Sequence, residues 1–213
     1  MRISRRLGAA ALTAGLALGT LLAAPASASA HTRPLGQASL AALLTSDGNR
    51  FDRDWHDYDI VTEAVLAVLA AKPGSPVGVL ADGSVPLTAF VPNDRAFQLL
   101  VKDLTGRWVT RESDVFAAVA GLGIDTVETV LLYHVVPGAT ITGRQARRSS
   151  GASLTTAQGG TITVKVPFRR FPLVLLRDQD RNDVNPFVVR FDLNKGNVQI
   201  AHGISLVLRP VDL

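Results

Sequence analysis

Residues 88–97 read Thr-Ala-Phe-Val-Pro-Asn-Asp-Arg-Ala-Phe, and this stretch decides much of the expected fold. The short, mostly apolar run at residues 87–91 is typical of a buried strand. A proline, an asparagine and an aspartate follow, which are residue types that begin helices, and apolar residues then recur at helical spacing. The stretch therefore predicts a strand that enters a helix through a tight corner, with the helix ending near Gly106.

Helical spacing dominates the first half of the chain around this corner. Apolar residues recur three and four positions apart, and Asp59 and Asp125 stand where N-caps would begin two of the helices. We expect helices at residues 38–44, 60–71, 92–106, 113–121 and 126–133. One further strand in this half is expected at residues 77–80.

The apolar period changes to two in the second half of the chain. Residues 161–166 alternate between polar and apolar side chains, and Gly159-Gly160 before them indicates a hairpin. We expect further strands at residues 173–176, 186–193 and 197–208. Helices followed by strands, rather than alternating with them, predict an α+β fold.

Residues 1–30 are typical of a secretory signal peptide. Three arginines near the start precede an apolar stretch, and small residues at 28–30 suit cleavage before His31. Cleavage after Ala28 is the nearest competitor, and a retained membrane anchor is the alternative interpretation. No later apolar stretch is long enough to span a bilayer, so the mature protein is expected to be secreted, with no membrane span.

The amino-acid composition excludes several kinds of functional site. The chain contains no cysteine, which removes disulfides, thiolate nucleophiles and thiolate metal sites together. The formal net charge is +4, but three of the arginines leave with the signal peptide, so the mature charge is near zero and gives no support for nucleic-acid binding. Basic residues nevertheless gather between positions 144 and 181. They form either a solvated face or a strip for an anionic glycan.

Three segments together resemble the fasciclin-like (FAS1) family. Residues 88–97 look like its first signature, residues 131–138 (Leu-Leu-Tyr-His-Val-Val-Pro-Gly) are similar to its Tyr-His signature, and residues 197–210 look like a weakened version of its final strand. The resemblance implies a wedge-like β-sandwich of about seven strands flanked by several α-helices. It departs from the family at residues 171–194, which are longer than the usual hairpin, and at Ser205, where an acidic residue is common.

The resemblance also implies a function and a set of binding residues. It implies a non-catalytic adhesion or interaction module that binds an extracellular or cell-surface protein or glycan. Tyr133 and His134 stand in the Tyr-His signature, and Asp192 and Leu193 stand where the family often has an Asp-Ile pair implicated in adhesion. For each pair the competing interpretation is structural: a hydrogen-bonded core histidine at a helix end, and an aspartate at a strand end.

A small secreted enzyme is the alternative function. It would use His134 or His202 with an aspartate, or copper bound by the mature N-terminal His31. A close Asp–His pair in an open cleft would favour the enzyme, whereas a buried His134 bonded to backbone would favour the binding module. Residues 178–183 resemble the opening of a calcium loop but lack its glycine and its glutamate, so a solvated hairpin tip is expected there.

The sequence therefore predicts that the chain consists of three segments, of which one is a folded domain. They are a signal peptide at residues 1–30, an N-terminal extension at 31–58 and a FAS1 domain at 59–213. We expect a monomer that needs no cofactor and no metal and that binds no nucleic acid.

Overall fold

The computed structural model describes residues 34–168, 170–171 and 173–212. The described residues belong to one compact unit, Pro34–Leu213. The predicted signal peptide at residues 1–30 and the predicted mature N-terminus at His31 lie outside the described residues.

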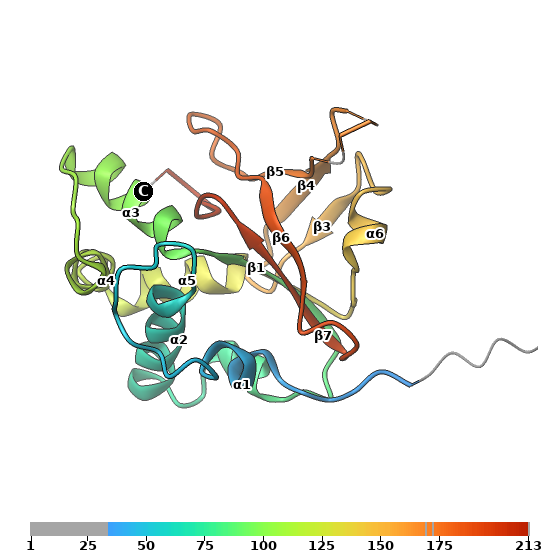
Figure 1. Cartoon of the computed structure of the whole chain (residues 1–213), viewed down its shortest axis with the longest axis horizontal. Coiled ribbons are helices and arrows are strands. Elements are labelled where there is room, and N and C mark those ends of the chain that lie inside the picture. The colour runs from blue at the N-terminus through green and yellow to red at the C-terminus, as the bar shows by residue number, and fades with distance from the viewer. Residues whose placement is uncertain (1–33, 169, 172, 213) are drawn as a thin grey trace, which may run out of the picture. The chain divides into compact units, whose positions relative to one another are not determined.

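Helices occupy the first part of the described chain and strands most of the rest, which Figure 1 shows by colour. The helices are α1 (Leu40–Leu44), α2 (Asp59–Ala71), the 3-10 helix η1 (Pro76–Ala81), α3 (Asp94–Thr105), α4 (Glu112–Ala120), α5 (Ile124–Tyr133) and α6 (Gly143–Ala146). The strands are β1 (Leu87–Pro92), β2 (Val135–Pro137), β3 (Ser153–Thr155), β4 (Thr161–Lys165), β5 (Leu175–Arg177), β6 (Val188–Leu193) and β7 (Gln199–Ile204).

The seven strands found in the described part of the chain form two sheets. One has the order β2-β1-β7-β6, in which β1 and β7 are parallel and the other pairs are antiparallel. The second is the antiparallel sheet β3-β4-β5. A bridge between Leu175 and Phe187 joins β5 to the segment that leads into β6. The predicted α+β fold, with two sheets and flanking helices, is confirmed.

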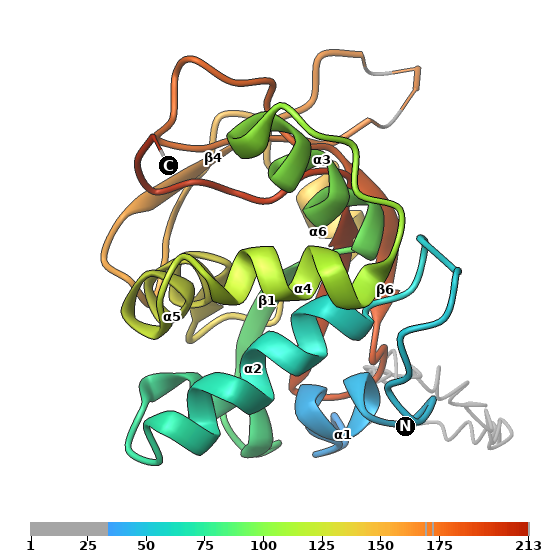
Figure 2. The ribbon, with the colours of Figure 1, turned by 90° about the vertical axis from the view of Figure 1, so that its left-hand side faces the viewer.

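Strand β1 lies at the centre of the fold because both of its faces are covered. All six of its residues are buried. Ala89 and Val91 pack into a core shared with the helices, whereas Phe90 packs into a second core built from strands of both sheets. Alternate side chains of a strand point to opposite faces, so a continuous apolar run suits a strand covered on both sides. Figure 2 shows α2, α3, α4 and α5 gathered on one side of these strands.

The predicted corner at residues 88–97 is confirmed. β1 ends at Pro92, and the Asn93 side chain caps α3 by accepting a hydrogen bond from the backbone N of Ala96 (3.0 Å). Gly106 follows the last turn of α3 with a φ of 70°, a left-handed conformation that favours glycine. Local sequence signals at both ends of α3 thus agree with the structure.

The strand predicted at residues 77–80 is wrong, because this segment lies within the 3-10 helix η1. The Ser75 side chain accepts a hydrogen bond from the backbone N of Val77, and Pro76 occupies the first turn. Only Val77 and Leu80 are buried within η1, and their separation of three positions matches one 3-10 turn.

The two N-caps predicted from aspartates are also wrong. Asp59 is the first residue of α2, and the backbone N of Ile60 donates instead to the Asp94 side chain, far along the chain (3.0 Å). Helix α5 begins at Ile124 and is preceded by Gly123, which adopts a φ of 89°. In each case a residue outside the local pattern sets the helix start.

The second half of the chain also differs from the expectation of strands alone. Strands β5, β6 and β7 are shorter than predicted, and the short helix α6 was not predicted. Thr142 and Gln145 form a capping box at the start of α6, and their three-residue spacing is the sequence signal that would have indicated it.

Among the described residues, no single helix is long and apolar enough to cross a membrane. Helices α4 and α5 reach that length and apolar character only together, as a pair bent by 104°.

Candidate functional site

Tyr133 and His134 lie at the end of α5 and are buried in the fold. Tyr133 is fully buried, and its hydroxyl donates to the carbonyl of Thr161 (2.7 Å). His134 is 4% exposed; its Nδ1 lies 2.7 Å from the carbonyl O of Val130, and its Nε2 accepts a hydrogen bond from the backbone N of Leu208 (2.9 Å). The pair thus joins α5 to the hairpin of β3 and β4 and to the segment after β7.

The two hydrogen bonds of His134 define its protonation state. Because Nε2 accepts from an amide, the proton of the neutral ring is on Nδ1, which donates to the carbonyl of Val130. Burial lowers the pKa of His134 to about 4, so the ring is neutral at pH 7. Burial raises the pKa of Tyr133 to about 12. Both side chains use their polar atoms within the fold.

Asp192 and Leu193 lie at the end of β6, where its pairing with β7 shifts register. Asp192 adopts a φ of 59°, and its Oδ1 accepts a hydrogen bond from the backbone N of Gly143 at the start of α6 (2.6 Å). Leu193 is half-buried against the helical core and pairs with Ala201 of β7. The hydrogen-bond partners of Asp192, which are Gly143 and His202, differ from those of Tyr133 and His134.

His202 in β7 completes the set of buried histidines in the described chain. It is fully buried; its Nδ1 accepts from the backbone N of Asp192 (3.1 Å), and its Nε2 donates to the carbonyl of Ile141 (2.8 Å). Burial lowers its pKa as well. His202 therefore meets the backbone of Asp192 rather than its carboxylate, and neither ring nitrogen is available to a substrate.

A groove of about 650 Å³ lies beside the edge strand β6. Its walls come from the segment before α2, the start of α3, the loop that leads into β6, and the residues after β7. The lining residues are His56, Tyr58, Asn93, Arg95, Leu99, Val184, Asn185, Phe187, Val189, Arg190, Ser205 and Leu206.

The groove combines exposed apolar side chains with positive charge. Val184 is 78% exposed, Val189 46% and Phe187 40%, which is unusual exposure for neighbouring large apolar residues. Arg95 and Arg190 are also exposed and line the same groove. An apolar or aromatic group with an anionic neighbour fits this combination. Sequence reasoning missed the groove, because its walls come from four segments far apart in the chain.

The family to which the chain belongs follows from its sequence. Residues 65–210, more than half of the chain, match the family model of the fasciclin domain. This chain belongs to the fasciclin family. Membership indicates an adhesion-type module in general, of a kind that is typically extracellular and non-catalytic.

One solved structure similar to this fasciclin chain is a FAS1 domain pair from the insect cell adhesion molecule Fasciclin I. The two are 15% identical, with a TM-score of 0.41, and the similarity covers 71% of this chain and 43% of that one. This chain therefore spans less than half the length of that structure. No curated protein matches the sequence.

The groove draws on residues that precede the matched fasciclin segment. His56 and Tyr58 come before residue 65, and the Tyr58 ring packs against Gly203 of β7, where a side chain would collide with its hydroxyl. Further upstream, the backbone N of Leu40 donates to the side chain of Gln199 at the start of β7 (2.8 Å). The segment before the matched residues is thus packed against the fasciclin domain and completes the groove.

The aspartates at residues 178–183 do not form the solvated hairpin tip that was predicted. Asp180 is 5% exposed, Asp178 Oδ2 accepts from the backbone N of Arg209 (3.0 Å), and the Arg209 guanidinium pairs with Asp183. These side chains hold the loop between β5 and β6 against the residues after β7. That prediction failed because Arg209 lies far away in the sequence.

Part of the basic segment noted in the sequence gathers on the β3-β4-β5 sheet. Lys165, Arg177 and Arg181 line a hollow of about 350 Å³. The other lining residues are Thr161 and Thr163 of β4 and, directly after β5, Asp178 and Gln179. Arg147 lies elsewhere, with its guanidinium 4.0 Å from the centre of the Phe191 ring. The hollow is a second surface with the chemistry to bind an anionic group.

Proposed function

We propose that this fasciclin protein is exported and acts as a monomeric, non-catalytic module that binds an extracellular or cell-surface protein or glycan through the groove beside β6. The observation that carries the proposal is the exposure of Val184, Phe187 and Val189 in one groove that two arginines also line. Exposed apolar groups that are grouped in this way favour burial against a partner.

The position of the groove supports a partner that approaches in an extended form. β6 is the edge strand of the sheet β2-β1-β7-β6, and only its first residue, Val188, is also bonded on the other side, to the carbonyl of Val174 (2.9 Å). An edge strand presents backbone donors and acceptors to an incoming segment, and neighbouring side-chain pockets then supply selectivity. A polypeptide with an apolar side chain next to an acidic one suits both the edge strand and the flanking arginines.

The state of the histidines supports binding rather than catalysis. General acid–base chemistry needs a ring nitrogen within reach of a substrate. His134 and His202 each use both ring nitrogens in hydrogen bonds within the fold. A buried His134 bonded to backbone is the arrangement expected of the binding module.

Binding to an array of extracellular proteins and wall glycans tests the proposal. The protein is collected from the medium, its N-terminal residue is determined by mass spectrometry, and the array is read with calcium and with chelator. Val184→Glu places a charge in the groove at a highly exposed position, so folding is preserved. Val211→Glu makes the same change at another exposed valine outside the groove (58% exposed).

We expect Val184→Glu to weaken binding by about tenfold or more, equivalent to about 1.4 kcal/mol, while Val211→Glu binds like the wild type. Equal binding by both variants would rule out the groove. Arg177→Glu tests the basic hollow in the same array. If Arg177→Glu abolishes binding to an anionic glycan and Val184→Glu does not, the binding site is that hollow and not the groove.

A further inference from the structure

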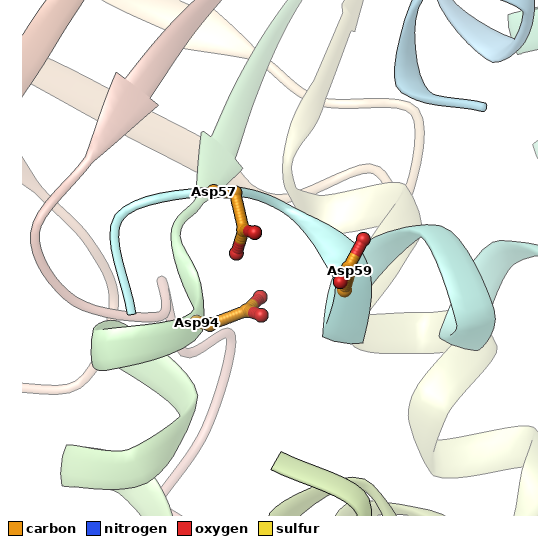
Figure 3. Close-up of side chains that lie close together, drawn as sticks. All are labelled: Asp57, Asp59 and Asp94. Carbon is orange, nitrogen blue, oxygen red and sulfur yellow. The ribbon is translucent and has the colours of Figure 1, made fainter. Parts of the chain in front are cut away.

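Three aspartates from two segments of the chain meet next to residues that line the groove. Asp57 comes from the segment before α2, Asp59 is the first residue of α2 and Asp94 is the first residue of α3. One carboxylate oxygen from each lies within 4.8 Å of the others. Figure 3 shows the Asp57 and Asp94 carboxylates pointing toward each other, with Asp59 beside them at the helix start.

The hydrogen bonds of the fold leave oxygens of this cluster unsatisfied. Asp94 is fully buried; its Oδ1 accepts from the backbone N of Ile60, but its Oδ2 is buried without a hydrogen-bond partner. The Oδ1 of Asp57 is likewise buried without a hydrogen-bond partner. Burying a carboxylate oxygen without a hydrogen-bond partner costs free energy. A hydrogen-bond donor or a bound cation at these two atoms would remove that cost.

A fourth carboxylate, that of the buried Glu112, adds to the negative charge. Glu112, the first residue of α4, is 1% exposed, and neither of its side-chain oxygens has a hydrogen-bond partner. Its charge contributes to raising the pKa values of Asp59 and Asp94. Across the described residues, the ion pairs formed by Lys and Arg involve none of the four carboxylates.

The titration of these groups reflects the same lack of positive charge. Burial, followed by the charge of Asp57, raises the pKa of Asp59 to about 7. Burial also raises the pKa of Asp94 well above its usual range, with a further contribution from the neighbouring Asp57. Like charges this close are relieved either by protons or by a bound cation, which reverses the local electrostatics.

We propose that Asp57, Asp59 and Asp94 bind a divalent cation and that the site prefers calcium. Carboxylate oxygens are hard ligands that suit Ca²⁺ and Mg²⁺. The three oxygens lie within 4.8 Å of one another, which is no more than twice a Ca–O distance of about 2.4 Å, as contact with one ion requires. Ligands from two segments, the residues around the start of α2 and the start of α3, suit the flexible coordination of calcium better than the strict octahedron of magnesium. The sequence alone predicted no metal site.

The cation site shares its segments with the groove, and this second part of the inference rests on the proposed function. His56 and Tyr58 flank Asp57, and Arg95 follows Asp94; all three line the groove. The backbone N of Asp94 donates to the carbonyl of Asp57 (3.1 Å). A cation held by both aspartates fixes the segment before α2 against the start of α3, so calcium sets the shape of the groove and strengthens partner binding.

Calcium binding is tested directly on the full secreted protein after chelator treatment. CaCl₂ alone is titrated by calorimetry, MgCl₂ is titrated in parallel, and the thermal midpoint is followed. We expect a Kd in the micromolar to millimolar range and a rise in Tm of about 5 to 10 °C at about 100 times the Kd. Absence of both heat and Tm shift up to about 10 mM CaCl₂ would overturn the site. Equal affinity for magnesium would overturn the calcium preference.

Variants assign the binding to these residues. Asp57→Asn, at a half-buried position, and Asp94→Asn should each weaken calcium binding about tenfold or more. Asp47→Asn, at an exposed aspartate ten residues before Asp57 and outside the cluster, should bind calcium like the wild type. Unchanged calcium affinity in a folded Asp57→Asn variant would place the ion elsewhere. If the wild-type protein does not bind calcium and the Asp57→Asn variant is more stable than the wild type, the repulsion between the carboxylates is relieved by protons and not by a cation.

The partner array separates the two levels of the inference. Calorimetry can show calcium binding while the array partner binds equally well with calcium and with chelator. In that case the cation site is supported and its coupling to the groove is refuted. If Val184→Glu leaves partner binding intact while Asp57→Asn still abolishes calcium binding, the groove proposal fails independently of the cation site.

Discussion

Replacing His134 by alanine tests how the end of α5 is held. The imidazole joins the carbonyl of Val130, one turn earlier in α5, to the backbone N of Leu208 after β7. His134→Ala removes both hydrogen bonds and leaves the Leu208 N–H buried without a partner. It also removes a ring that is 4% exposed from the core.

The expected loss of stability is the sum of these effects. Two hydrogen bonds contribute about 1 kcal/mol each, and a buried unsatisfied amide costs about 1–3 kcal/mol. His134→Ala should therefore lower the free energy of unfolding by about 3–5 kcal/mol. His134→Gln retains an acceptor near the Nε2 position and should lose only about 1–2 kcal/mol.

Urea unfolding followed by circular dichroism measures both variants. His56→Ala, at the exposed histidine of the groove, is the matched control and should stay within about 0.5 kcal/mol of the wild type. The reasoning is refuted if His134→Ala is as stable as His56→Ala. If His134→Ala keeps its stability and yet loses partner binding, His134 is a contact residue rather than part of the core.

Two further predictions concern pH and the wall of the groove. The pKa of His134 is about 4 when folded against 6.5 for a free histidine, so the stability that the neutral ring provides is complete above about pH 6.5 and is lost as the pH falls toward 4, by about 3 kcal/mol in urea titrations. In Gly203→Ala the new Cβ would lie 2.2 Å from the Tyr58 hydroxyl, so Tyr58 must move, and chemical unfolding should show a loss of about 1–3 kcal/mol.

Each of these predictions has its own control. His134→Gln lacks the titrating ring, so its stability should fall less between pH 6.5 and 4; parallel curves for His134→Gln and the wild type would contradict the pH assignment. Gly74→Ala adds a Cβ in open space and should change stability by less than about 0.5 kcal/mol. Tyr58→Phe removes the colliding hydroxyl and should recover part of the Gly203→Ala loss; no recovery would mean that the collision lies elsewhere.

Features built from neighbouring residues could be predicted from the sequence. The corner at residues 88–97 is one example, because the apolar run, the Asn93 cap and the stop at Gly106 are all local signals. The hairpin after Gly159-Gly160 is another, since β3 and β4 pair across it. The fold class followed from the order of such segments.

Features built across the chain could not be predicted in this way. Helix α2 starts at Asp59 with an amide bonded to Asp94, a contact that no local pattern contains. The same long-range contact brings Asp94 to Asp57, although the two aspartates are 37 positions apart in the sequence. The groove likewise depends on Tyr58 reaching Gly203.

The measurement that tests the central claim most directly is the ratio of two dissociation constants for the first partner that the array identifies. These are the Kd of Val184→Glu, inside the groove, and the Kd of Val211→Glu, outside it, measured in the presence of calcium. The account predicts a ratio of about ten or more, corresponding to at least about 1.4 kcal/mol of binding free energy. A ratio near one, with both proteins folded, would contradict the assignment of the groove as the binding site.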